Sequence, residues 1–145
     1  MAMNLRFLDR VQPLAFLVMR LVLGIIMVAH GYGKVFGGLH KHAELVASLG
    51  MPAWLGYVSA AAEFLGGLLL IVGFATRCAA LAVCVDMVVA ILKVHLHNGL
   101  LGQNGYQFPL ALAALAFALI FTGAGVISLD WVFSGGGGGG GGGKR

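Results

Sequence analysis

The chain has 145 residues, of which 60% are hydrophobic and 10% are charged, and its formal net charge is +4 with a pI near 9.4. Soluble domains carry about a quarter charged residues, so a chain with a mean hydropathy of +0.98 cannot be a soluble protein and is expected in the lipid bilayer. Its basic residues lie near expected helix ends and not in a patch interleaved with aromatic residues, which excludes nucleic acid as a partner.

The N-terminal segment, residues 1–12, carries two arginines ahead of an apolar run that begins near Pro13 and ends near Val35. Proline is favoured in the first turn of a helix. The run has about the length that a helix needs to cross the hydrocarbon core. Arg20 interrupts it and no small-residue cleavage site follows, so we expect a retained signal anchor and not a cleaved signal peptide.

Three further apolar segments follow along the chain, and no long stretch alternates with period two as an amphipathic strand would. We therefore predict an all-α, four-helix transmembrane bundle over residues 13–130. The three further segments are Ala53–Phe74, Arg77–His95 and Phe108–Val126. Residues 131–145 are rich in glycine, which is typical of a flexible tail.

The connections between these segments differ in length. Residues 36–52 form the longest, and the stretch LHKHAELVASL within it has apolar residues at helical spacing, which predicts a short interfacial helix. The basic residues on the side of the termini are Arg6, Arg10, Arg77, Lys144 and Arg145. The loops of the other side contain only Lys41, so the positive-inside rule predicts a multi-pass protein of the cell (inner) membrane with both termini in the cytoplasm.

Five charged residues fall within the predicted spans, where charge is costly and marks functional candidates. They are Arg20, Lys34, Glu63, Asp86 and Lys93. Each lies among small residues at helical spacing, which predicts that it points into the bundle. A rise of about 1.5 Å per residue puts Arg20, Glu63 and Asp86 in one buried polar layer. Either Arg20 and Glu63 form a structural ion pair, or Glu63 or Asp86 transfers protons.

A second polar group gathers at the outer ends of the spans. Its members are His30, Tyr32, Lys34, Lys93 and His95. The lysines could simply reach the lipid headgroups. Alternatively, the group lines an outer mouth that binds the headgroup of a quinone-like ligand, whose tail remains in the lipid.

Two less favoured interpretations of the same histidines remain. His30 and His95 could be the axial ligands of a b-type haem. The stretches HKH and HLH could bind a metal, but residues i and i+2 do not share a helix face, so we assign no metal site.

Three stretches, RLVLGIIMVAHGYGKVFGG, AAAEFLGGLLLIVGFATRCAAL and GAGVISLD, resemble in this order the DoxX family of small four-helix membrane proteins. By this resemblance, Arg20, Lys34 and Glu63 fall on the family's recurrent polar positions. The resemblance implies a role in oxidoreduction at the membrane, since relatives look like subunits of thiosulfate:quinone oxidoreductase and others accompany catechol-handling or oxidative-stress enzymes.

We therefore expect an integral membrane subunit of a quinone-linked oxidoreductase system, which receives electrons from a soluble or membrane redox partner. The sequence has no flavin, nucleotide or iron–sulfur motif, so this chain is not expected to catalyse the reaction alone. Two alternatives remain open. One is a non-catalytic anchor or scaffold that recruits redox or stress-response enzymes, and the other is a pathway for protons or small solutes through the buried polar layer.

Overall fold

The computed structural model describes residues 5–136, which contain helices and no strand. The α-helices are α1 (Arg6–Gly37), α2 (Leu39–Ser48), α3 (Trp54–Val72), α4 (Thr76–Ala90), α5 (Gln107–Thr122) and α6 (Leu129–Phe133), and α4 continues into the π-helical turn η1 (Ile91–His95) and the 3₁₀ turn η2 (Leu96–Asn98). The predicted all-α membrane bundle is confirmed. Helix α1 crosses the predicted boundary between the N-terminal segment and the bundle at residue 12, and α6 crosses the predicted boundary between the bundle and the tail at residue 130. Residues 137–145 of the predicted tail lie outside the described part.

Three helices are long and apolar enough to cross a membrane, and they correspond to the first three predicted spans: α1, α3 and the continuous helix Thr76–Asn98. The fourth predicted span is shorter than expected. Helix α5 has 16 residues, because Gly123 takes a φ of +73° and ends it. It is therefore roughly 24 Å long, and the chain up to Val126 is not helical.

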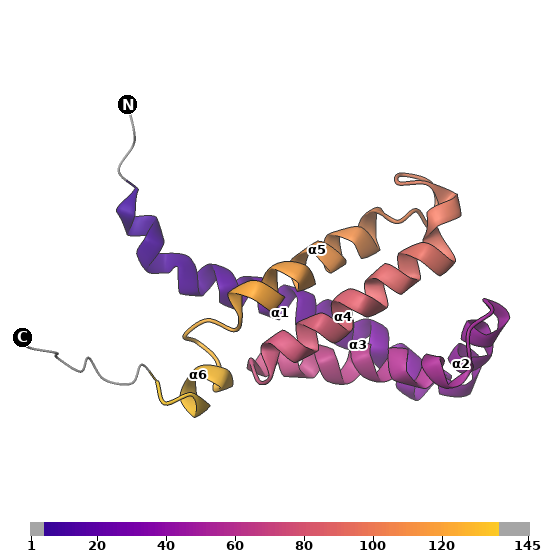
Figure 1. Ribbon diagram of the computed structural model, residues 1–145, viewed down its shortest axis with the longest axis horizontal. Helices are drawn as coiled ribbons and strands as arrows, with labels where there is room; N and C mark the ends of the chain where they lie inside the picture. Colours follow the sequence, from indigo (N-terminus) through magenta and orange to yellow (C-terminus); the bar gives the residue numbers. More distant parts are fainter. Residues whose placement is uncertain (1–4, 137–145) are drawn as a thin grey trace, which may run out of the picture.

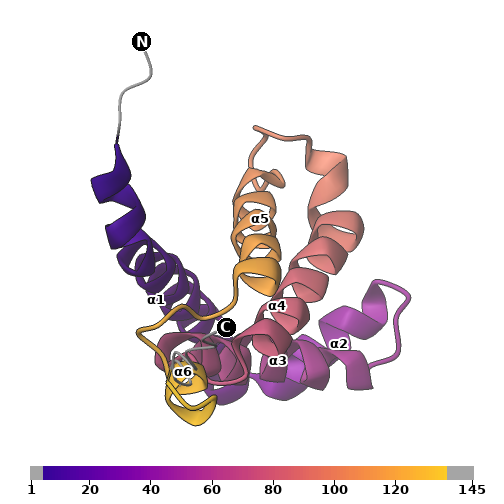
Figure 2. The same cartoon turned by 60° about the vertical axis from the view of Figure 1, so that its left-hand side comes forward.

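The helices form two antiparallel pairs, α1 with α3 and α4 with α5 (Figures 1 and 2). The pairs meet in a core of small and aliphatic side chains, which includes Leu23, Met27, Leu70, Ala79, Val83, Leu112, Ala116 and Leu119. Towards the ends that carry α2 and η1, the two pairs splay apart, so that η1 and α2 lie away from each other in both views.

Glycines allow the close approach of α1 and α3. A Cβ added to Gly31 would lie 2.5 Å from the backbone nitrogen of Phe64, and one added to Gly67 would lie 2.8 Å from the carbonyl oxygen of Gly24. Any larger side chain would push the two helices apart. The prediction that small residues mark the packed face of the first helix is confirmed for the stripe that contains Gly24 and Gly31, both of which are buried.

The same rule is wrong for α4 and its extension. Lys93 was predicted to point into the bundle, but it is exposed, as is Ala82, while Asp86 is half-buried. The buried residues of this helix are Thr76, Ala79, Ala80, Val83 and Met87. Alanines occur on several faces of α4, so small size alone does not identify its packed face.

The short helix predicted within residues 36–52 is present as α2. It packs against the start of α3, where a Cβ added to Gly56 would lie 2.6 Å from the Cα of Ala43. Ala43 and Val46 are buried and Lys41 is exposed, so α2 has one apolar and one polar face. Such a helix suits the membrane surface.

Candidate functional site

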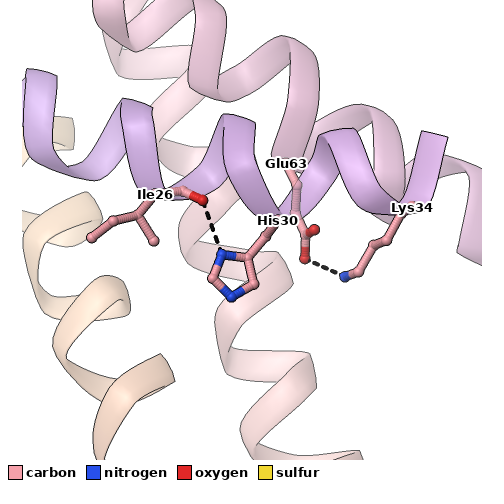
Figure 3. A network of polar contacts seen from close by, with 4 residues as sticks. All are labelled: Ile26, His30, Lys34 and Glu63. Atoms are coloured by element: carbon pink, nitrogen blue, oxygen red, sulfur yellow. Dashed lines mark hydrogen bonds and ion pairs between the residues drawn. The ribbon is translucent and has the colours of Figure 1, made fainter. Parts of the chain in front are cut away.

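An ion pair between Lys34 of α1 and Glu63 of α3 forms the centre of the candidate site (Figure 3). The Lys34 Nζ lies 2.5 Å from Glu63 Oε1, with the two side chains 29% and 4% exposed respectively. The second oxygen, Glu63 Oε2, is buried and has no hydrogen-bond partner among the described residues. A buried carboxylate therefore has one acceptor atom left for a further donor.

The predicted pair of Arg20 with Glu63 is wrong. Arg20 is 1% exposed and donates to three backbone carbonyl oxygens, those of Leu70 at 3.1 Å, Ala124 at 2.6 Å and Ile127 at 2.8 Å. Leu70 lies roughly 10 Å further along α3 than Glu63. The predicted buried polar layer therefore divides into two separate sites.

Arg20 belongs to a structural clasp at the end of the bundle where α3, α4 and α5 meet. Beside it, the Asp130 carboxylate accepts hydrogen bonds from the backbone nitrogens of Ala75 at 2.7 Å and Thr76 at 2.9 Å, at the start of α4. Burial opposes ionisation, but the bonds from Thr76 and Ala75 and the charge of Arg20 outweigh it and lower the pKa of Asp130. We name Arg20 and Asp130 the clasp.

Asp86 extends the Lys34–Glu63 pair from the neighbouring helix. Although only half-buried, its carboxyl group lies close to the side chains of Ser59 and Glu63, and the charge of Lys34 also acts on it. Two carboxyl groups thus face one ammonium, which leaves one negative charge in excess when all three are ionised. Because an unpaired charge is costly away from water, a proton held on one carboxyl group balances the site.

His42 of α2 completes this site, although the sequence analysis did not select it. The residue is half-buried and its Nε2 has no hydrogen-bond partner among the described residues. Burial lowers the pKa of His42, the Lys34 charge lowers it further, and Asp86 opposes both, so the ring is neutral at pH 7. We name the following residues the polar cluster: Lys34, His42, Ser59, Glu63 and Asp86.

Two residues of the predicted outer mouth lie on α1 beside this cluster. His30 is exposed, and its Nδ1 donates to the carbonyl oxygen of Ile26 at 2.9 Å, which leaves Nε2 as an acceptor. Its ring lies 5.7 Å from that of Phe108 on α5, and Figure 3 shows His30 and Lys34 on the same side of α1. Tyr32 is exposed and packs on Phe36 instead, at 4.8 Å between ring centroids.

The other two residues of the predicted mouth lie on η1, which both views place away from α2. His95 Nδ1 donates to the carbonyl oxygen of Asn104 at 2.7 Å, and Lys93 is exposed. The structure therefore brings His30 and Lys34 together but holds His95 to the loop before α5. Within residues 5–136, no three His, Cys, Asp or Glu side chains gather in an arrangement that could hold a metal ion.

An open depression of about 580 Å³ lies beside the clasp, at the other end of the bundle. Its wall includes Arg77, Asp130 and Trp131. Arg77 donates to the carbonyl oxygen of Ile120 at 3.2 Å, and Asp130 holds the start of α4. Both charged groups are thus engaged within the protein, and the polar cluster remains the stronger candidate.

Comparison with known proteins identifies the family of the chain. The DoxX family model matches residues 15–96. The chain is 34% identical over 120 residues to "Putative oxidoreductase CatD" of Bacillus subtilis (strain 168), with 82% of this chain and 87% of that protein covered. It is 28% identical over 127 residues to "Inner membrane protein YqjF" of Escherichia coli (strain K12), with 85% and 95% covered. No solved structure matches at a significant level, and the whole polar cluster lies within the range that the family model matches.

Proposed function

Since the chain belongs to the DoxX family, we propose that it is the membrane subunit of a quinone-linked oxidoreductase system and binds the quinone headgroup at the polar cluster. A relative with oxidoreductase in its name supports the redox role. The observation that carries the proposal is the ion pair of Lys34 with Glu63, whose second oxygen is buried without a partner. Polar groups in this state are rare inside proteins and call for an explanation, of which a bound ligand is one; Thr76 Oγ1 at the clasp end is also without a partner.

The chemistry of the cluster suits both redox forms of such a ligand. A quinone carbonyl accepts hydrogen bonds, and Lys34 and Ser59 can donate them. A quinol hydroxyl donates hydrogen bonds, and Glu63 Oε2 and His42 Nε2 can accept them. The same cluster can therefore hold the ligand before and after its reduction.

The position of the cluster also suits a ligand that arrives through the lipid. Lys34 is the more exposed partner of its ion pair, so a headgroup can meet the ammonium while Glu63 stays buried. The two helix pairs splay apart at this end of the bundle (Figure 2), and the exposed ring of Phe108 lies beside His30 there. The sequence carries no flavin, nucleotide or iron–sulfur motif, so we assign the electron supply to a partner redox protein.

We place the chain in the cell (inner) membrane, with both termini in the cytoplasm. Three helices of sufficient length and a relative named as an inner membrane protein support the membrane. The bias of basic loop residues towards the side of the termini supports the orientation. The polar cluster then reaches from the middle of α3 to α2 on the outer side.

Binding of a short-tailed ubiquinone to the full chain in lipid nanodiscs tests the proposed function. Lys34→Met removes a donor to the ligand, which costs about 1–3 kcal/mol and so weakens binding roughly tenfold to hundredfold. Lys93→Met, at an exposed lysine outside the cluster, is the matched control and should bind like the wild type.

A folding defect is separated from a binding defect by a double variant. Lys34→Met with Glu63→Leu replaces the whole ion pair by apolar groups, which is often tolerated, and thermal unfolding checks that it folds. It should fold and bind quinone weakly. If the wild type binds no quinone, or if Lys34→Met binds quinone as well as the wild type does, the proposed function is wrong. The alternative of a non-catalytic scaffold then takes its place.

A further inference from the structure

We propose that His42 carries protons between the aqueous phase on the α2 side of the membrane and the polar cluster. This inference rests on the proposed function as far as the purpose of the protons is concerned, since quinone chemistry consumes or releases them. The route itself depends on the position of the His42 side chain. It assigns α2 as the proton entrance and exit of the site.

Packing fixes the inward position of His42. Its neighbour Ala43 lies against Gly56 of α3, so closely that a Cβ on the glycine would be 2.6 Å from the Ala43 Cα. His42 therefore faces the bundle, with Nε2 buried and without a partner. By contrast, His40 is exposed and pairs with Glu44 at 3.2 Å.

The charges of groups on two of the long helices act on His42. Lys34 of α1 and Asp86 of α4 both act on the imidazole electrostatically, with opposite signs. On α2 itself, Lys41 and Glu44 are exposed and face solvent. His42 is thus placed between the water-facing surface of α2 and the carboxyl groups of the cluster.

Charge balance supplies the proton to be moved. Asp86 and Glu63 share the single ammonium of Lys34, so a cluster without net charge requires a proton on one carboxyl group when His42 is neutral. In the outward step, the O–H bond of Asp86 breaks as its proton passes to a bridging water molecule, which gives one of its own protons to Nε2 of His42, leaving a carboxylate and an imidazolium. The imidazolium then releases the proton of its other ring nitrogen to water. No electrons move, and the reverse order protonates the cluster.

The experiment measures how fast the protonated carboxyl group exchanges its proton for deuterium. The full chain in nanodiscs is transferred to deuterated buffer, and the shift of the infrared carbonyl band of the carboxyl group is followed over time. Asp86→Asn should abolish the band and so assigns it. His42→Gln should slow the exchange roughly a hundredfold, as expected for removal of a positioned proton-transfer side chain. His40→Gln, at the exposed histidine of the same helix, should leave the rate unchanged.

A chemical rescue separates proton transfer from a structural effect. Free imidazole added to His42→Ala should restore fast exchange, whereas a merely structural histidine would not be replaced in this way. Exchange in His42→Gln as fast as in the wild type would overturn the proposal. The measurement needs no quinone, so a wild type that binds none but exchanges through His42 refutes only the proposed function, and quinone binding with His42-independent exchange refutes only this inference.

Discussion

Lys34 reaches Glu63 because a glycine one turn earlier lets two helices touch. The Phe64 backbone of α3 occupies the space that a Cβ of Gly31 would need. Phe64 follows Glu63 in the chain, so the contact that brings the helices together also sets the carboxylate near the next turn of α1. The long lysine side chain spans the remaining distance and keeps its end partly exposed. The Lys34–Glu63 ion pair therefore depends on Gly31, a residue that carries no charge and acts through helix packing.

Two substitutions of Glu63 test how much the Lys34–Glu63 ion pair contributes to the free energy of unfolding. Glu63→Gln keeps an acceptor oxygen for Lys34, whereas Glu63→Ala leaves the ammonium without one. We expect Ala to lower the free energy of unfolding by about 1–3 kcal/mol and Gln to cost clearly less. Thermal unfolding in detergent measures the difference, with Glu44→Ala at an exposed position as the control. Equal and negligible effects of both changes at Glu63 would contradict the pair.

The sequence is sufficient to select Lys34 and Glu63 as unusual, but not to pair them. Counting a fixed rise per residue placed Arg20 beside Glu63. In the structure the guanidinium is taken by the carbonyls of Ala124 and Ile127, in a stretch without regular secondary structure. Which carbonyls such a stretch turns inward depends on its backbone angles, and residue types alone do not determine them.

At the scale of elements, apolar length predicts the three helices that are long enough to cross the membrane, because lipid leaves no other way to satisfy a spanning backbone. The helix ends are harder to predict. Gly73 with a φ of +71° ends α3 and Gly123 with a φ of +73° ends α5. The chain has 24 glycines. Some end helices and others allow two helices to touch, and the residue type alone does not distinguish the two roles.

The missed histidine shows a signal that could have been used. Leu39, His42 and Val46 follow the spacing of three and four residues, which places His42 on the apolar face of α2. A polar residue on an otherwise apolar face breaks the local pattern, and such breaks concentrate at functional sites. The sequence analysis weighed His42 only as half of a metal-binding stretch.

Two glycines of α1 provide a matched test of helix packing. A Cβ at Gly31 would lie 2.5 Å from the Phe64 backbone, whereas a Cβ at Gly33 would have nothing within 4 Å. Gly31→Ala should therefore lower the thermal unfolding temperature and loosen the Lys34–Glu63 pair. Gly33→Ala should be neutral or stabilising by about 0.5–1 kcal/mol, because alanine favours the helix. Similar unfolding temperatures for the two variants would contradict the close contact.

At the scale of the whole molecule, the two ends of the bundle differ. The clasp of Arg20 and Asp130 ties α1, α3, α4 and the segment after α5 together at one end, beside the open depression. At the other end the two helix pairs splay apart and α2 packs against the start of α3 (Figure 1), and the polar cluster lies between α2 and the middle of α3. Stability and the proposed chemistry are thus separated along the axis of the bundle.

Cysteine labelling tests which end of the bundle faces the cytoplasm. The basic loop residues favour the cytoplasm for the clasp end, so α2 and the proton entrance should face outward. In a background in which Cys78 and Cys84, both free thiols, are replaced by serine, single cysteines are introduced as Lys41→Cys on α2 and Ser134→Cys beside the clasp. A membrane-impermeant maleimide should label position 41 in intact cells and position 134 only after permeabilisation. The reverse pattern would invert the topology and place the exchange of protons through His42 on the cytoplasmic side.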